Sequence, residues 1–542
     1  MSSSRLHCYI YLVKHFKSRF IHAVFASIFA LCVAIHAGAA PANLAPVPPT
    51  VDSITPTELR MHLEFLASDE LGGRFTLAPN FGISARYLAS QLKAYGYKGL
   101  GDHGDYLQHF DVISSKPDTA KTTLTITVGG QTAAYNFGDV YPSNTSIDGE
   151  AQGQIVFVGR GISSPSQKHD DYAGLDVKNK IVLIVPGNAP GVDPSKLGDN
   201  ETGQGAARAH GAVAIIQIPP KRFAAFMQSK EFKEHAGERE SVRLAKDAEG
   251  KLPAITLSPE TADKIFSSMG LNLKAIYESD KKPIEPKALD ASAKLVVGLR
   301  QERVTTQNVV GLLEGTDPEL KKEYVTFSAH YDHLKTGPGG EIYHGADDDG
   351  SGTTAILSIA HAMSLQRPKR SVMIIFHAGE ELGLLGSAYN ADYAPALPLG
   401  RMVVDLNIDM IGRSKPPGDS DDADKHLTDA HTIYLVGADR ISPELNKLSE
   451  QTNSDFQKLK LDYFYNDPNE PERIYFRSDH WNYAKHGIPI IFYFDGVHVD
   501  YHKPTDTVDK IDFTKMTAVT KLVFETGWRI ANLDHRLKRS GE

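Results

Sequence analysis

Residues 324–363 read YVTFSAHYDHLKTGPGGEIYHGADDDGSGTTAILSIAHAM. The run Tyr324–Phe327 is largely apolar on both faces, which is typical of a strand buried inside a parallel sheet. Thr353–Met363 has the apolar spacing of a helix that crosses over such a sheet. Between the two, histidine and aspartate are concentrated. The stretch therefore predicts an α/β fold with polar side chains gathered where a strand ends.

Three more near-continuous apolar runs follow in the C-terminal half of the chain: Val372–Phe376, Met402–Ile408 and Ile488–Phe494. Helical patterns alternate with them, so we expect a mixed, largely parallel sheet flanked by helices. In open sheets of this kind, ligands bind outside the carboxyl ends of the strands, because the loops converge there. The loops after these runs are therefore the expected place for chemistry.

The N-terminal half of the chain predicts two helices followed by a β-rich module. Thr55-Pro56-Thr57-Glu58 has the form of a capping box that starts the first helix, and Gly82–Tyr95 has the spacing of the second. In residues 116–287 the helical spacing gives way to short apolar runs, and we expect a separate β-rich module there. Its short apolar runs are Leu124–Val128, Ile155–Val158, Ile181–Val185 and Ala212–Ile218.

Composition limits the classes of protein to consider. The chain has 542 residues, 41% hydrophobic and 23% charged, which is enough for roughly two to four domains with packed cores. Its formal net charge of −9 argues against a nucleic-acid partner, because such binding depends on basic surfaces that face phosphates.

The first 39 residues have the form of a cleavable signal peptide. Basic residues precede the apolar run Phe20–Ile35, and Ala37-Gly38-Ala39 ends the segment. An uncleaved membrane anchor is the alternative. We expect an exported protein, periplasmic or secreted, with no stable membrane insertion after cleavage. Both cysteines, Cys8 and Cys32, lie in this segment, so a metal site in the mature chain must use His, Asp and Glu.

Polar clusters follow the ends of all four predicted strands: His330-Tyr331-Asp332-His333, Gly345–Gly352, His377–Glu381, Asn407–Met410 and Asp500–Asp506. Each cluster alone is explained by a surface turn or by a helix N-terminus, where carboxylates are favourable. Together they are not, because several carboxylates at one sheet edge need compensating positive charge. Two imidazoles with three or more carboxylates suit Zn²⁺, and one bridging carboxylate can hold two metal ions. The combination indicates metal-assisted hydrolysis.

The order H-x-D, G-A-D-D-D-G-S-G, G-E-E, N-x-D-M and D-Y-H-x-P-x-D resembles the di-zinc exopeptidases of metallopeptidase family 28, the secreted aminopeptidase family. The resemblance implies a zinc exopeptidase fold whose N-terminal part spans residues 50–115 and whose catalytic domain spans 288–538. The segment between them, 116–287, is similar to a protease-associated domain. That similarity rests on Asp171–Leu175, Lys178–Val182 and Gly205–Ala212.

The resemblance also implies roles for single residues, with two Zn²⁺ ions per chain. His330 and Asp409 would bind one ion, Glu381 and His502 the other, and Asp348 would bridge both. A cis peptide bond is expected between Asp348 and the residue after it.

Three further residues would support catalysis. Asp332 would orient the imidazole of His330. Glu380 would be the general base, taking a proton from a water held between the metal ions and delivering it to the leaving amine. Tyr475 would stabilise the tetrahedral oxyanion, with a place in the core as its alternative. The remaining histidines near the motifs are expected to line the cleft or to hydrogen-bond the ligands: His333, His344, His377, His480 and His498.

The function expected from this resemblance is that of an exported di-zinc aminopeptidase acting on peptides. A carboxypeptidase or dipeptidase is the alternative with the same metal core, because Arg473 and Arg477 lie near the site in sequence and could hold a free carboxylate. A receptor-like binding protein without catalysis is the alternative from another class. The sequence predicts no particular oligomeric state.

Overall fold

The computed structural model describes residues 44–541 except 199 and 278–283. The signal peptide predicted for residues 1–39 lies outside the described residues. Within them, no helix combines the length and the apolarity that crossing a bilayer requires.

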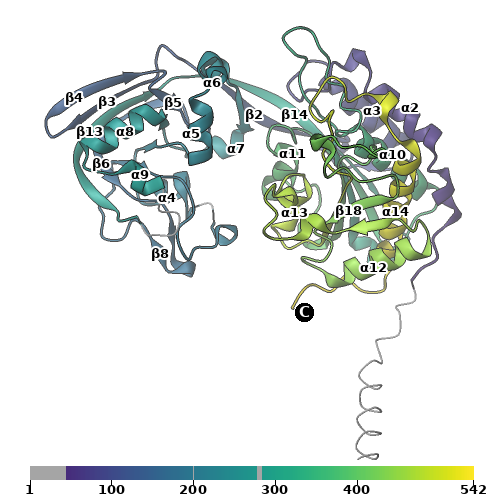
Figure 1. The fold of residues 1–542 in the computed structure, drawn as a ribbon. Coiled ribbons are helices and arrows are strands. Elements are labelled where there is room, and N and C mark those ends of the chain that lie inside the picture. The colour runs from purple at the N-terminus through teal and green to yellow at the C-terminus, as the bar shows by residue number, and fades with distance from the viewer. Residues whose placement is uncertain (1–43, 199, 278–283, 542) are drawn as a thin grey trace, which may run out of the picture.

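Two sheets in two lobes organise the described chain (Figure 1). The first has the order β11-β2-β14-β16-β15-β17-β20-β18-β19, with β1 paired to β14. Its four central strands are parallel to one another and its outer pairs are mostly antiparallel, which confirms a mixed sheet with a parallel centre. Its strands are β1 Lys98–Gly99, β2 Leu107–Pro117, β11 Ser241–Leu244, β14 Leu299–Leu313, β15 Tyr324–His330, β16 Ser371–His377, β17 Met402–Ile408, β18 Thr432–Val436, β19 Lys460–Asp462 and β20 Ile490–Phe494.

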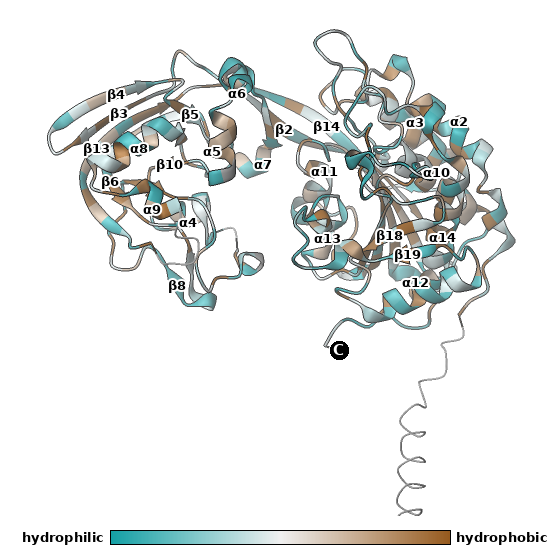
Figure 2. Cartoon of the chain, in the orientation of Figure 1, coloured by the Kyte–Doolittle hydropathy of each residue, from teal (hydrophilic) through white to brown (hydrophobic). Residues whose placement is uncertain are grey.

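Helices cover both faces of this sheet, in α2 Pro56–Leu66, α3 Phe81–Ala94, α10 Gly350–Leu365, α11 Leu385–Ala388, α12 Pro443–Asp455, α13 His480–Ala484 and α14 Phe513–Ala531. One face packs against α2, α3, α10, α12 and α14, and the other packs against α13. The central strands are hydrophobic, whereas the outer helix α12 is largely hydrophilic (Figure 2). This lobe thus has three layers, with the sheet buried between helices on its two faces.

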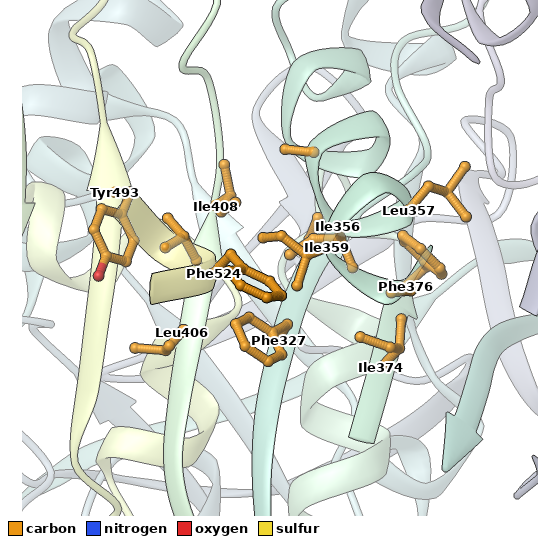
Figure 3. Close-up of a cluster of buried hydrophobic side chains, with 14 of the residues drawn as sticks. Phe327, Ile356, Leu357, Ile359, Ile374, Phe376, Leu406, Ile408, Tyr493 and Phe524 are labelled. Carbon is orange, nitrogen blue, oxygen red and sulfur yellow. The ribbon is translucent and has the colours of Figure 1, made fainter. Parts of the chain in front are cut away.

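The main core lies between the central strands and α10 and α14 (Figure 3). Phe327 of β15 and Leu406 of β17 are fully buried there against Phe524 of α14. Burying a side chain of this size stabilises the fold by about 1.5–3 kcal/mol. This core fixes the ends of the central strands, from which the polar loops project.

The predicted helix starts are confirmed with small shifts. Thr55 Oγ1 accepts the backbone N–H of Glu58 at 3.2 Å, with Pro56 as the first residue of α2. Helix α10 begins at Gly350, earlier than predicted, because Asp349 Oδ1 accepts the N–H of Gly352 at 2.8 Å and caps it.

The second sheet has the order β4-β3-β13-β6-β9-β10-β12-β5. We call this sheet and its helices, within residues 118–297, the insert. Its strands are β3 Thr123–Val128, β4 Gln131–Asn136, β5 Val140–Pro142, β6 Gly149–Phe157, β9 Ile181–Ile184, β10 Ala214–Gln217, β12 Ala254–Leu257 and β13 Lys287–Val297, with β7 Ser163–Ser164 and β8 His169–Asp170 in a separate pair. Its helices are α4 Gly203–Ala209, α5 Lys221–Met227, α6 Lys230–His235, α7 Ala245–Ala248, α8 Pro259–Ser268 and α9 Leu273–Tyr277.

The predicted boundaries of this module need two corrections. The boundary at 287/288 is wrong, because β13 pairs with β3 and β6 and so belongs to the insert up to Val297. Strand β11, inside the predicted module of 116–287, instead pairs with β2 at the edge of the first sheet. The sequence shows no break after 287, since β13 passes into β14 through Gly298 alone.

A ribbon of β2 and β14 connects the two lobes, with β11 paired to part of β2 (Figure 1). Strands β2 and β14 pair antiparallel without interruption from Leu107↔Val309 to Pro117↔Leu299. At the insert end, a Cβ on Gly298 would lie 2.6 Å from the Cβ of Lys121, so only glycine fits there.

Candidate metal centre

The carboxyl ends of the central strands lie side by side. β15 and β16 are in register so that His330, the last residue of one, is opposite His377, the last residue of the other. β17 ends at Ile408, directly before Asp409. The loops after these strands therefore leave from the same edge of the sheet, as the sequence predicted.

A first group of side chains surrounds the imidazole of His330. His330 Nε2 lies 3.3 Å from Asp348 Oδ1, 3.6 Å from Asp409 Oδ1 and 3.9 Å from Glu380 Oε2. His330, Asp348 and Asp409 are all buried. Their ligand atoms lie within 4.8 Å of one another, which is close enough to hold one metal ion.

A second group shares Asp348 with the first. His502 Nε2 lies 3.1 Å from Asp348 Oδ2 and 3.0 Å from Glu381 Oε2. His333 Nδ1 lies 2.7 Å from Glu381 Oε1 on the other side of the same carboxylate. Asp348 thus turns one oxygen toward each group, as a bridging ligand must. The five predicted ligands converge around this residue.

The charges and donor atoms of this site fit two divalent cations. His330 Nε2 is buried and makes no regular hydrogen bond with any described residue. Burial alone would lower the pKa of His502, but its contacts with Asp348 and Glu381 raise it to about 10. Burial raises the pKa of Glu380 well above its usual range, and Glu381 and Asp409 raise it further. The site therefore carries an excess of buried negative charge that a pair of cations would balance. The nitrogen and oxygen donors suit Zn²⁺ and other first-row metals.

Asp332 supports both His330 and Glu380. Asp332 Oδ1 accepts the backbone N–H of Glu380 at 3.2 Å, and Oδ2 accepts the hydroxyl of Thr76 at 2.7 Å. His330 Nδ1 lies 3.1 Å from the carbonyl oxygen of Asp332 and 3.7 Å from its Oδ1. The predicted orienting residue thus lies on the correct side of the imidazole, with its backbone carbonyl as the nearer acceptor.

The backbone around Asp348 is held by two other aspartates. Asp506 Oδ2 accepts the N–H groups of Asp347 at 2.9 Å and Asp348 at 3.2 Å. The peptide bond between Asp348 and Asp349 is cis, which confirms that expectation. Asp349 Oδ1 also accepts the N–H of Met410 at 3.2 Å, which ties the loop after β17 to the start of α10. The role of Asp506 was not predicted, although the residue ends the last of the five motifs.

Cavities of different size open on the two sides of Asp348. Beside Asp409 lies a small pocket of about 30 Å³ with an apolar wall. That wall comprises Met410, Ile474, Phe492, Phe494 and Val497. Beside Glu381 and His502 lies an open cleft of about 670 Å³, which we call the metal cleft.

Residues 308–527 match the family model for peptidase family M28. The chain contains a peptidase family M28 domain. The five predicted ligands and Glu380 all lie within the matched residues. The resemblance to metallopeptidase family 28 is thereby confirmed for these residues, and the similarity of 116–287 to a protease-associated domain stays a prediction.

Known proteins similar to this chain extend the comparison. Probable leucine aminopeptidase 2 of Aspergillus oryzae is 28% identical over 324 residues, which cover 59% of this chain and 52% of that protein. Aminopeptidase YwaD of Bacillus subtilis is 30% identical over 159 residues, covering 29% and 32%. The chain thus spans about half or less of the length of these relatives. The solved structure of an aminopeptidase from Aneurinibacillus sp. strain AM-1 has the same fold, with a TM-score of 0.53 at 20% identity over 91% of this chain and 97% of that one.

The tyrosine that reaches the metal centre of the M28 domain is Tyr501, not Tyr475. Tyr501 lines the small pocket, and its ring stacks on that of His502 at 3.8 Å between centroids. Burial raises its pKa, and the charges of Asp348 and Glu381 raise it further. Tyr475 is buried in the core, where the guanidinium of Arg440 lies 3.8 Å from its ring centroid. The adjacency of Tyr501 to a predicted ligand is the sequence feature that could have indicated it.

Of the other histidines near the motifs, His333 forms with Asp348 and Glu381 a group close enough to hold a metal ion, so it is a further candidate ligand. His333 contacts a predicted ligand, Glu381, and His498 Nε2 lies 3.3 Å from Asp347 Oδ2. His344 pairs with Asp69 at 2.7 Å, farther from the centre. His480 Nε2 lies 2.8 Å from the carbonyl oxygen of Tyr475.

Proposed function

We propose that this protein is an exported zinc aminopeptidase that removes N-terminal residues from peptides. The observation that carries the proposal is the position of Asp348 between two ligand groups, with Glu380 beside one of them. The matched family is a peptidase family, and both similar proteins named above are called aminopeptidases. Export is proposed from the composition of residues 1–39.

The residues have separate tasks in this proposal. His330, Asp348 and Asp409 would hold one Zn²⁺, and Asp348, Glu381 and His502 the other. When bound, the two cations would polarise the scissile carbonyl group and activate water for attack. Glu380 takes a proton from the attacking water on its carboxylate and delivers it to the nitrogen of the leaving amine. Its backbone is fixed for this task by Asp332, which accepts the N–H of Glu380.

The unequal cavities favour cleavage next to a chain end. The small pocket has room for no more than one side chain, whereas the metal cleft has room for a longer chain. Glu380 and Asp409 both line the small pocket, so a free α-ammonium group bound there would face negative charge. We therefore propose that an apolar N-terminal residue occupies this pocket and that the rest of the peptide leaves through the metal cleft.

One observation favours the second candidate, a carboxypeptidase or dipeptidase. Arg477 is exposed and lines the same small pocket, where its guanidinium could hold a free carboxylate. Arg473 does not contribute in this way, since its guanidinium lies 4.6 Å from the ring centroid of Phe476. N-acetylated and C-amidated forms of one peptide separate the two candidates, because an aminopeptidase rejects only the first.

The proposal is tested with leucyl p-nitroanilide and leucine-initiated peptides, before and after metal removal and zinc readdition. We expect activity to disappear with the chelator and to return with zinc. In Glu380→Gln, zinc content is expected to persist while turnover falls by about 10²–10⁴-fold, the usual contribution of a general base. A zinc-loaded protein that hydrolyses no amino-acyl substrate would refute the enzymatic function and leave the receptor-like alternative. Sequencing the N-terminus of the exported protein tests cleavage after residue 39.

A further inference from the structure

The insert contains a cavity of about 420 Å³, which we call the insert cavity. Its wall has an apolar part, which includes Tyr141, Phe223, Met227 and Phe232, and a polar part, which includes Arg239. The apolar residues belong to an aromatic cluster in which the rings of Tyr141 and Phe232 lie 5.2 Å apart, edge to face. Pockets that bind organic ligands have such walls with a few polar groups among them. The polar groups here include Gln217 and Thr256.

The insert cavity adjoins the metal cleft. Asn144, Glu240 and Ser241 line both cavities, so they form a shared junction. The metal cleft ends at the predicted ligands Glu381 and His502. The metal cleft and the insert cavity therefore meet at this junction, and we call the two together the trough.

The junction presents groups that suit a peptide backbone. Asn144 is exposed there with its amide free to donate and accept. The charge of Glu240 is balanced by Lys116 at 3.8 Å and Lys335 at 3.9 Å, so the passage is not strongly charged. Strand β11 is the last strand of the first sheet, and its other edge pairs with no described strand. An extended peptide can add to such an edge through backbone hydrogen bonds.

We propose that the insert cavity binds an apolar or aromatic side chain of the peptide substrate, several residues beyond the scissile bond. This inference rests on the proposed peptidase function. The N-terminal residue occupies the small pocket, the following residues cross the junction along the metal cleft, and the downstream side chain contacts the wall formed by α5, α6 and β5. The insert thus selects peptides by a residue that the metal centre never contacts.

The test compares a short and a long substrate in matched variants. Hydrolysis of leucyl p-nitroanilide depends on the metal centre alone. Hydrolysis of a glycine-rich octapeptide that starts with leucine depends on the whole trough, and a single phenylalanine is placed at each later position of this peptide in turn. In the wild type, kcat/KM for the octapeptide should peak at one position of the phenylalanine. Asn144→Trp places a bulky ring at the exposed junction and should lower this peak relative to the nitroanilide by about tenfold or more, the worth of burying one aromatic side chain. Phe223→Ala should reduce the same peak by removing part of the wall.

Asn136→Trp is the matched control, because Asn136 is also exposed in the insert but lines neither cavity. It should leave the ratio of octapeptide to nitroanilide hydrolysis as in the wild type. Equal ratios in Asn144→Trp and the wild type, with the nitroanilide still hydrolysed, would overturn the inference and leave the proposed function intact. If the wild type hydrolyses neither substrate, the proposed function fails. Binding of the fluorescein-labelled octapeptide then decides the inference, and equal affinity for Asn144→Trp and the wild type refutes it.

Discussion

Replacing Asp506 by asparagine is expected to weaken zinc binding without unfolding the protein. Asp506 is fully buried, and its Oδ2 accepts the N–H groups of both Asp347 and Asp348. On its other side, Oδ1 lies 3.7 Å from the guanidinium of Arg413. Both carboxylate oxygens therefore face donors. An asparagine amide must turn its NH₂ group toward one of these donors, so the substitution cannot preserve both contacts.

The size of the effect follows from these contacts. A hydrogen bond to a charged acceptor contributes about 1.5–3 kcal/mol, against about 0.5–1.5 kcal/mol for a neutral one. Losing the charge from two such bonds removes about 2–3 kcal/mol from the support of Asp348. Residues that orient metal ligands typically change metal affinity by about 10–100-fold when they are replaced. We expect a loss in this range, and at both sites, because Asp348 is shared by the two ligand groups.

Zinc affinity is measured by competition with a chromophoric chelator, with circular dichroism as the check on folding. Asp171→Asn is the matched control, since Asp171 is also buried and accepts one backbone N–H, that of Ile162 at 3.0 Å, within the insert. A folded Asp506→Asn protein that binds both zinc ions as tightly as this control would show that Asp506 does not position the bridging ligand.

Three further predictions concern the reaction, acid stability and the core. Tyr501→Phe should lower kcat by about tenfold or more with zinc content unchanged, because it removes a hydroxyl that can donate to the developing oxyanion. Tyr475→Phe should leave kcat nearly unchanged, because Tyr475 lies in the core. Steady-state kinetics that give the reverse order for the two variants would contradict the assignment. Burial lowers the pKa of His480 to about 3, below its value of about 6.5 in the unfolded chain. The unfolded state alone therefore gains this proton as the pH falls below 6.5, and the free energy of unfolding should drop by about 1.4 kcal/mol per pH unit until the pH approaches 3. Urea unfolding of His480→Asn should show a pH slope smaller by one proton, and an unchanged slope would exclude His480 as the cause. Phe327→Ala should cost about 3–5 kcal/mol in the same measurement, because the ring is fully buried against Leu406 and Phe524; a loss below 1 kcal/mol, on the order of a surface substitution, would contradict that packing.

The sequence predicted best what local patterns determine. Near-continuous apolar runs located the central strands, and Met402–Ile408 has the predicted bounds. Because parallel strands end at one edge, the positions of residues after those strands were enough to bring the five predicted ligands together. Their role as ligands stays a prediction, to be tested by metal binding.

Features that depend on tertiary packing were harder to predict. Tyr475 and Tyr501 both lie near motifs, and only the fold turns one ring toward Arg440 and the other toward His502. The insert boundary was misplaced because β13 and β14 follow each other through Gly298, so no linker composition separates two strands that belong to different sheets. The role of Asp506 could not be predicted either, because the sequence does not distinguish a carboxylate that accepts backbone N–H groups from any other carboxylate.

The length of the ribbon of β2 and β14 sets the distance between the two lobes. Its pairing has no bulge, so the distance from the sheet edge to the insert is set by a count of residues in two strands. Each residue adds about 3.3 Å, and side chains alternate between faces. Adding two residues to each strand would therefore carry the insert about 7 Å outward with the same face turned to the metal centre, whereas adding one would rotate its contacts to the opposite side. Among related chains, differences in ribbon length in steps of two would thus change the preferred length of substrate without any change at the metal ligands.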